Sequence, residues 1–409
     1  MYAKLTNPTK IIALASVASF ALAACGTDSS SGGASSAAPV ATEQESATPR
    51  LALSYDGGVL ILDANSLDQV ADIPVEGFTR LNSAGNGRNV FVSTSDGFQV
   101  LDMGTWTESH GDHGHSYTAT PVMTDMRFGG TKPGHVVPHD GRITLFSDGT
   151  GEVDIVDPDA LAEGRAESTS HTVPEPHHGV AVARADDTLV VSVGNEDERS
   201  GIAILDGDRR EIARNDQCPG IHGESGAADG VLTFGCEDGI LIVRGNEIQK
   251  VQSPDGYGRI GNQAGDESSP ISFGDYKKEQ DAELERPQQF SLTDTRNGTI
   301  RIVPISTSYS FRSLERGPNG EAVLLGTDGA IHVFDVNTGA EIRSVPAIGA
   351  WTEPDEWQSP MPNMVVQNGV AYVSDPSAKT ITAFDLADGK RKDQAQLPQT
   401  TIELTGVTG

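Results

Sequence analysis

The segment from Val92 to Asp102 reads Val-Ser-Thr-Ser-Asp-Gly-Phe-Gln-Val-Leu-Asp, and variants of this pattern recur along the chain. Each copy has two short apolar runs, and Asp-Gly or Asn-Gly separates them in most copies. Because these dipeptides accept the positive φ of a tight turn, each copy predicts a β-hairpin. Eight copies occur, at residues 53–63, 92–102, 145–157, 191–206, 233–243, 290–303, 325–335 and 373–385.

The spacing of these hairpins predicts the fold. Successive copies begin about 40 to 55 residues apart, and helical periodicity is almost absent. This pattern is typical of a β-propeller, in which four-stranded sheets bury both faces by packing around a central axis. We therefore predict an all-β protein with a single β-propeller of eight blades over residues 50–409. Seven blades are an alternative because residues 244–290 lack a regular strand pattern, and a two-domain β-sandwich is another.

An additional strand precedes most of the hairpins and would be the innermost strand of its blade. No such strand precedes the first hairpin, because the expected linker ends there. The C-terminal run at residues 401–407, Thr-Ile-Glu-Leu-Thr-Gly-Val, can supply it and close the ring. The other inner strands begin near Arg80, His135, His178, His222, Asn262, Arg312 and Asn363.

The N-terminus has the pattern of a lipoprotein signal. Lys4 and Lys10 precede an apolar run that ends in Leu-Ala-Ala-Cys25. The run is shorter than the roughly 20 residues of a membrane-spanning helix. We expect a signal peptide over residues 1–24, then a lipidated Cys25 and a flexible Ser/Gly/Ala linker over residues 25–49. The protein is then extracytoplasmic and anchored to the cell membrane by lipid alone; a secretory signal without lipidation is the alternative.

The charge and the cysteines restrict the partners and the compartment. The formal net charge is −29, which excludes nucleic-acid binding and favours divalent cations near the surface. We expect a monomer.

Cys218 and Cys236 flank a predicted turn, and an oxidising compartment permits a disulfide between them. A free pair or a thiolate metal site is the alternative.

Nine of the ten histidines lie between residues 110 and 222. His135, His178 and His222 occupy the start of three consecutive inner strands, so the propeller should bring them to one mouth of its central channel. An insertion at residues 104–134 contains the sequence His-Gly-Asp-His-Gly-His at residues 110–115. We expect this insertion to be a mobile loop over the same mouth.

These histidines predict a zinc site, because neutral imidazole is a favoured zinc ligand. Copper(I) is disfavoured, since no methionine or free cysteine accompanies the cluster. The alternative for His178 and His222 is a hydrogen-bonded structural histidine. His139 and His171 are either ligands or solvated loop residues, and His332 should be a packing or surface residue. The candidate ligands are His110, His113, His115, His135, His177, His178 and His222, with Asp112, Asp125 and Glu224 as carboxylate ligands or hydrogen-bond partners.

Enzyme signatures are weak in this chain. Neither His-Glu-x-x-His nor Gly-x-Ser-x-Gly occurs. Residues 256–261 match Gly-x-Gly-x-x-Gly, but no strand–helix context surrounds them. We therefore expect no enzymatic activity. The alternatives are a lactonase-type propeller enzyme that uses a divalent metal, and a surface scaffold that binds proteins without metal.

Together, the export signal, the eight repeats, His-Gly-Asp-His-Gly-His, Pro-His-His-Gly and Ile-His-Gly-Glu resemble the AztD family of zinc metallochaperones. The resemblance runs from residue 50 to the end and is most specific over residues 110–226. It implies a β-propeller that binds zinc and passes it to the solute-binding protein of a zinc ABC transporter. It also implies zinc ligation by His113 and His115 in a flexible loop, and by His135, His178 and His222 at the propeller face. The lipid-anchor signal at Cys25 departs from a free periplasmic form.

Overall fold

The computed structural model describes residues 40–409. The predicted signal peptide and Cys25 lie outside the described residues. Within residues 40–409, neither helix is long and apolar enough to cross a bilayer. The short helices are α1 (Pro158–Ala162) and η1 (Ala228–Gly230).

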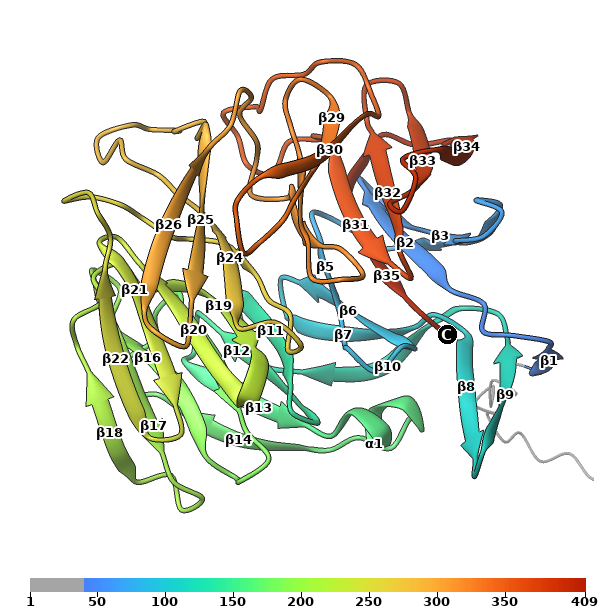
Figure 1. Cartoon of the computed structure of the whole chain (residues 1–409). Helices are drawn as coiled ribbons and strands as arrows, with labels where there is room; N and C mark the ends of the chain where they lie inside the picture. Colours follow the sequence, from blue (N-terminus) through green and yellow to red (C-terminus); the bar gives the residue numbers. More distant parts are fainter. Residues whose placement is uncertain (1–39) are drawn as a thin grey trace, which may run out of the picture. The chain divides into compact units, whose positions relative to one another are not determined.

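The described residues form eight four-stranded antiparallel sheets and one three-stranded sheet, and the eight larger sheets stand around a central axis (Figure 1). They are the blades of a β-propeller, as predicted. From the centre outward, blade 1 is β35 (Thr401–Val407), β2 (Arg50–Tyr55), β3 (Gly58–Asp63) and β4 (Gln69–Pro74). Blade 2 is β5 (Arg80–Ser83), β6 (Asn89–Thr94), β7 (Gly97–Asp102) and β10 (Val122–Phe128). Blade 3 is β11 (Pro133–His139), β12 (Arg142–Ser147), β13 (Glu152–Val156) and β14 (Ser168–Thr172). Blade 4 is β15 (Ala181–Ala183), β16 (Leu189–Gly194), β17 (Arg199–Leu205) and β18 (Glu211–Asn215).

The remaining blades follow the same order from the centre outward. Blade 5 is β19 (His222–Ala227), β20 (Val231–Cys236), β21 (Gly239–Arg244) and β22 (Glu247–Gln252). Blade 6 is β23 (Gln263–Ala264), β24 (Ile271–Asp275), β25 (Gln289–Asp294) and β26 (Thr299–Pro304). Blade 7 is β27 (Leu314–Arg316), β28 (Ala322–Leu325), β29 (Ala330–Phe334) and β30 (Glu341–Pro346). Blade 8 is β31 (Asn363–Gln367), β32 (Val370–Asp375), β33 (Thr380–Asp385) and β34 (Arg391–Gln396).

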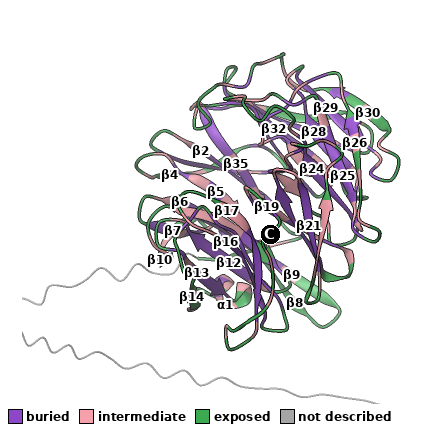
Figure 2. Cartoon of the chain, turned by 90° about the vertical axis from the view of Figure 1, so that its left-hand side faces the viewer, coloured by how far each residue is buried: buried purple, intermediate pink, exposed green. Residues whose placement is uncertain are grey.

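The hydrophobic core lies between neighbouring blades. Eight apolar clusters occur, one at each blade-to-blade contact. One of them joins the first blade to the last, through Leu51 and Leu60 on one side and Tyr372 and Ile381 on the other. Figure 2 shows buried residues on the strands inside the ring and exposed residues on the outer strands. Because each sheet buries both faces against its neighbours, no blade has a core of its own.

The C-terminal strand completes the first blade. β35 pairs with β2 in antiparallel register, with Leu404 opposite Leu53 and Val407 opposite Arg50. The predicted inner strand at residues 401–407 is therefore confirmed. One sheet thus contains both ends of the propeller, and its hydrogen bonds hold the ring closed.

Blade 6 differs from the predicted repeat. The copy at residues 290–303 forms its outer hairpin, β25–β26, whereas every other copy forms the middle hairpin of its blade. The middle strand β24 escaped the sequence pattern because a long connection at residues 276–288, and not a tight turn, follows it. The inner strand β23 has only two residues. The sheet still has four strands, so the blade number is eight.

The predicted linker and insertion also contain regular structure. Residues of the predicted linker form strand β1 (Thr42–Gln44), which pairs with β9 (His113–Thr118) and not with any blade. β9 and β8 (Thr105–His110) form a hairpin. β1 is ordered because it completes the free edge of this hairpin, where Gln44 also donates a hydrogen bond to Thr118. The folded body therefore begins before residue 50.

The predicted disulfide joins Cys218 and Cys236. Both cysteines are fully buried in the apolar cluster between blades 4 and 5. The bond ties the connection that leads into β19 to the end of β20, in the blade that carries His222.

Removal of residues 401–409 should prevent the ring from closing. The variant loses the pairing partner of β2 and exposes the apolar contact between blades 1 and 8. We expect loss of the cooperative thermal transition measured by circular dichroism. Removal of residues 408–409 alone leaves β35 intact and serves as the control. A normal transition in the longer truncation would show that the C-terminal strand does not hold the ring.

Candidate metal centre

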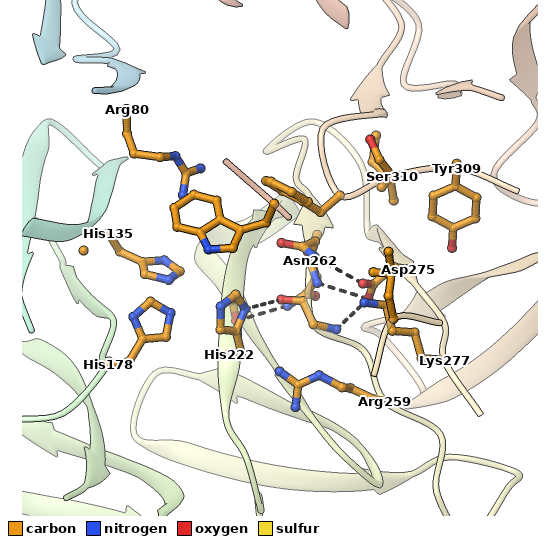
Figure 3. A pocket seen from close by; sticks show the side chains of 18 of the residues that line it. Arg80, His135, His178, His222, Arg259, Asn262, Asp275, Lys277, Tyr309 and Ser310 are labelled. Carbon is orange, nitrogen blue, oxygen red and sulfur yellow. Dashed lines mark hydrogen bonds between the residues drawn. The ribbon is translucent and has the colours of Figure 1, made fainter. Parts of the chain in front are cut away.

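Three consecutive blades bring three histidines together at one mouth of the channel, as predicted. His135 lies on β11, His178 precedes β15, and His222 begins β19 (Figure 3). Their ring centroids are 5.3, 5.3 and 5.0 Å apart. One nitrogen from each ring lies within 4.8 Å of the others, which suits ligation of a single metal ion. We call His135, His178 and His222 the triad.

Each Nδ1 atom of the triad has its own neighbour. His178 Nδ1 lies 2.5 Å from Asp148 Oδ2, and His222 Nδ1 donates to the Gly261 carbonyl at 2.7 Å. His135 Nδ1 lies 3.4 Å from Glu224 Oε2. A histidine whose Nδ1 is hydrogen-bonded presents Nε2 to a metal in a fixed orientation, as His178 and His222 do here. His135 has the Glu224 carboxylate beside its Nδ1 atom without a hydrogen bond, which favours the same orientation. The arrangement therefore favours Nε2 as the ligand atom of each ring.

The position of His222 depends on the connection that follows blade 5. Gly223 has φ +66°, and a Cβ atom there would lie 2.3 Å from the Gly261 carbonyl oxygen, so glycine permits the close approach. Asp275 accepts hydrogen bonds from the backbone nitrogens of Gly261 and Asn262, at 2.5 and 3.0 Å (Figure 3). Asp275 thereby holds the carbonyl group to which His222 donates.

The electrostatic environment keeps His222 neutral. Burial lowers the pKa of His222 well below its ordinary value, and His135, His178 and Arg259 lower it further. Neutral imidazole is the form that binds zinc, so the site requires no proton loss from His222 at neutral pH.

Glu224 gives a further indication that the donor set fits a cation. Its Oε2 atom is buried and has no hydrogen-bond partner among the described residues. An unpaired buried carboxylate oxygen is costly, and a cation at the triad would lower that cost. Three imidazole nitrogens with a carboxylate beside them match the tetrahedral nitrogen and oxygen ligation of zinc.

Comparison with known proteins supports the same interpretation. No family model matches the chain. The zinc chaperone AztD of Citrobacter koseri is 26% identical over 364 residues, which cover 86% of this chain and 84% of that protein. The predicted resemblance to AztD is confirmed.

Solved structures of AztD show the same fold. The crystal structure of Citrobacter koseri AztD superposes with a TM-score of 0.78 at 24% identity, and covers 89% of this chain and 99% of that chain. A structure of apo AztD from the same organism gives 0.76 at 23% identity, with 89% and 98% covered.

The histidines of the insertion lie on hairpin β8–β9 and not on an irregular loop. The ring centroids of His110 and His113 lie 5.3 and 5.1 Å from that of His115. Asp112 Oδ1 lies 3.1 Å from His113 Nδ1. His115 Nδ1 lies 2.7 Å from Glu43 Oε1 of β1, a partner that the sequence did not indicate. All three imidazoles are substantially exposed.

The hairpin does not lie over the triad, which corrects that expectation. Inner strands run away from the mouth that carries the triad, and successive strands of a blade are antiparallel. β7 therefore ends at the opposite face of blade 2, and the hairpin leaves the blade there. The C-terminal residue Gly409 lies at this face, where it accepts from Thr107 of β8 (Figure 1).

Two other histidines are structural. His177 is adjacent to His178 in sequence but is buried, and its ring nitrogens contact the Glu175 carbonyl and Ser192 Oγ, each at 2.8 Å. Its assignment as a candidate ligand is therefore corrected, because both nitrogens are occupied. His332 packs between Asp328 and Glu341, as predicted.

The remaining candidates lie apart from the triad. His139 is buried and pairs with Glu267 at 2.8 Å, so it is not a solvated loop residue. His171 lies on the outer strand β14. Asp125 lies on β10.

The sequence did not assign a role to Asp148 or Asp275. Asp148 is the aspartate of the Asp-Gly turn in the third repeat. Its role could have been suspected only because this turn and the first residues of the inner strands lie at the same mouth of the channel. Asp275 ends the strand that the repeat pattern missed.

Asp148→Asn should weaken zinc binding by about tenfold or more, because it removes the negative charge beside His178. Competition with a chromogenic chelator measures this affinity. Asp328→Asn is the matched control, since Asp328 pairs with His332 outside the triad. Equal zinc affinity in the Asp148 variant and the wild type would show that Asp148 does not contribute to the zinc site.

The metal-free protein should lose stability as the pH falls below about 6.5. Burial lowers the pKa values of His171, His177 and His222, so the unfolded chain binds protons at a higher pH than the folded chain does. In the His222→Gln variant, the decrease in Tm between pH 7.5 and pH 5 should be smaller than in the wild type. His110→Gln, at an exposed hairpin position, is the control. A slope unchanged by His222→Gln would contradict this account.

Proposed function

We propose that this chain is an extracytoplasmic zinc metallochaperone that delivers zinc to the solute-binding protein of a zinc ABC transporter. The observation that carries the proposal is the triad. One nitrogen from each of its three rings lies within 4.8 Å of the others, and the Nδ1 atoms of His178 and His222 are held by hydrogen bonds. The similarity to the zinc chaperone AztD supports zinc as the ion and transfer as the activity.

The exposure of the triad is graded in a way that suits stepwise transfer. The side chain of His178 is 46% exposed, and that of His135 is 20% exposed. His222 is the most deeply held, through Gly261 and Asp275. An incoming ligand can therefore displace His178 first while His222 retains the ion. Exchange through shared intermediates avoids release of zinc into water.

We assign the hairpin histidines to zinc capture at a separate location. His110, His113 and His115 are close together and exposed, but they belong to the opposite face from the triad. Their exposure favours rapid exchange and weaker binding than at the triad, where Gly261 and Asp275 hold His222 in place. The predicted lipid anchor at Cys25 would keep the protein at the membrane, close to the transporter.

Zinc binding tests the ligand assignment. The wild type should bind one zinc ion tightly, and the double variant His178→Ala, His222→Ala should lose at least a hundredfold in affinity for it. The matched double variant His113→Ala, His115→Ala should retain the tight site. Isothermal titration in competition with a chelator measures both. Tight binding that survives in the first variant and disappears in the second would reverse the assignment.

Transfer tests the chaperone activity. Zinc-loaded protein is mixed with the metal-free solute-binding protein of the organism's zinc ABC transporter, and zinc in each protein is measured after separation. We expect transfer to be faster than spontaneous zinc loss, which a parallel sample with chelator alone reports. Equal rates in the two samples would indicate release into solution and would contradict direct delivery.

A further inference from the structure

The triad occupies one side of a cleft that is far larger than a metal ion requires. The cavity has a volume of about 800 Å³. Cavities of this size typically hold a small molecule or a short stretch of polypeptide. The cleft therefore has room for a protein segment above the ion.

The other side of the cleft is built by two long connections between strands. These are residues 276–288, between β24 and β25, and residues 347–362, between β30 and β31. Arg286 of the first connection donates to the Glu353 carbonyl at 2.7 Å and to Asp355 Oδ1 at 2.9 Å in the second. The two connections thus support each other.

An aromatic wall, made of Phe311 and Trp357, lines this part of the cleft, and Phe78 packs against Trp357. Trp357 meets Phe78 edge to face, with ring centroids 5.3 Å apart. The Arg80 guanidinium lies 5.6 Å from the Trp357 ring and 5.9 Å from the Phe311 ring. These contacts fix the wall before any partner arrives.

Trp357 is nevertheless 46% exposed, and it is the one aromatic residue among the exposed large hydrophobic residues at positions 40–409. Exposed tryptophan beside arginine is the composition typical of interface hot spots. Its place in the same cleft as the triad links this surface to the metal centre.

We propose that the aromatic wall is the docking surface for the zinc-accepting protein, which places a segment without net negative charge in the cleft beside the triad. The proposal rests on the proposed function. A zinc–nitrogen bond is about 2.0–2.1 Å long, so the incoming ligand must reach the triad itself. A segment in the cleft meets the aromatic wall on one side and the most exposed ligand, His178, on the other.

The charges that line the cleft favour an incoming segment without net negative charge. Six carboxylate side chains line the cleft, against three arginine or lysine side chains. An acidic segment would meet net repulsion, whereas a neutral or basic segment would not.

Trp357→Ala tests the docking role in the full zinc-loaded protein. With the metal-free solute-binding protein at subsaturating concentration, we expect transfer to slow at least tenfold. Zinc affinity and the rate of zinc removal by EDTA should stay within twofold of the wild type, because a small chelator does not need the wall. Trp357→Phe should retain most of the transfer rate. Ile342→Ala, at a 54% exposed position on the outer strand β30, is the matched control.

The outcomes separate this inference from the proposed function. If the wild type does not transfer zinc, the proposed function fails. If the wild type transfers and Trp357→Ala transfers equally fast, the docking surface alone is wrong.

Acrylamide quenching gives a second test that does not depend on the folding of the alanine variant. Comparison of the wild type with Trp357→Phe identifies the fluorescence of Trp357. When the acceptor is added to the wild type, acrylamide should quench this fluorescence less, and unchanged quenching would overturn the proposal.

Discussion

Apolar packing between neighbouring sheets is the constraint on which the rest of the structure depends. Each blade buries both faces only because another blade lies on each side, and the contact of Leu51 and Leu60 with Tyr372 and Ile381 closes the circle. Residues at equivalent positions of successive blades then converge at the same mouth of the channel. A metal centre can be assembled from residues that are more than 40 positions apart in sequence, without a dedicated loop to hold them.

The same register position carries different chemistry around the ring. In blades 3, 4 and 5 it holds the triad. On the opposite side, Glu403 of the inner strand of blade 1 lies 3.2 Å from Arg80 Nε and 2.5 Å from Arg312 Nη2. This ion pair network supports the arginine that contacts the aromatic wall. One half of the mouth is thus suited to a metal ion and the other half to a protein surface.

Sequence reasoning was sufficient where the signal was local and periodic. The Asp-Gly hairpins, the inner strand at residues 401–407 and the equivalent positions of His135, His178 and His222 all follow from strand periodicity. It failed where tertiary contacts decide. β24 precedes a long connection in place of a tight turn, and β1 is ordered by the edge of β9. The strand pattern selected His178 but could not exclude its neighbour His177 as a ligand, because only the fold turns His178 into the cleft and His177 onto Ser192. The partners Asp148 and Glu43 lie on separate strands or turns, so their roles required the structure.

The central claim is that zinc binds the Nε2 atoms of His135, His178 and His222, which Glu224, Asp148 and the Gly261 carbonyl orient from the Nδ1 side. Anomalous diffraction at the zinc absorption edge, on crystals of the zinc-loaded protein, tests this claim most directly. The account predicts a peak about 2.0–2.1 Å from all three Nε2 atoms. A strongest peak at hairpin β8–β9, or ligation of the triad through Nδ1, would contradict it.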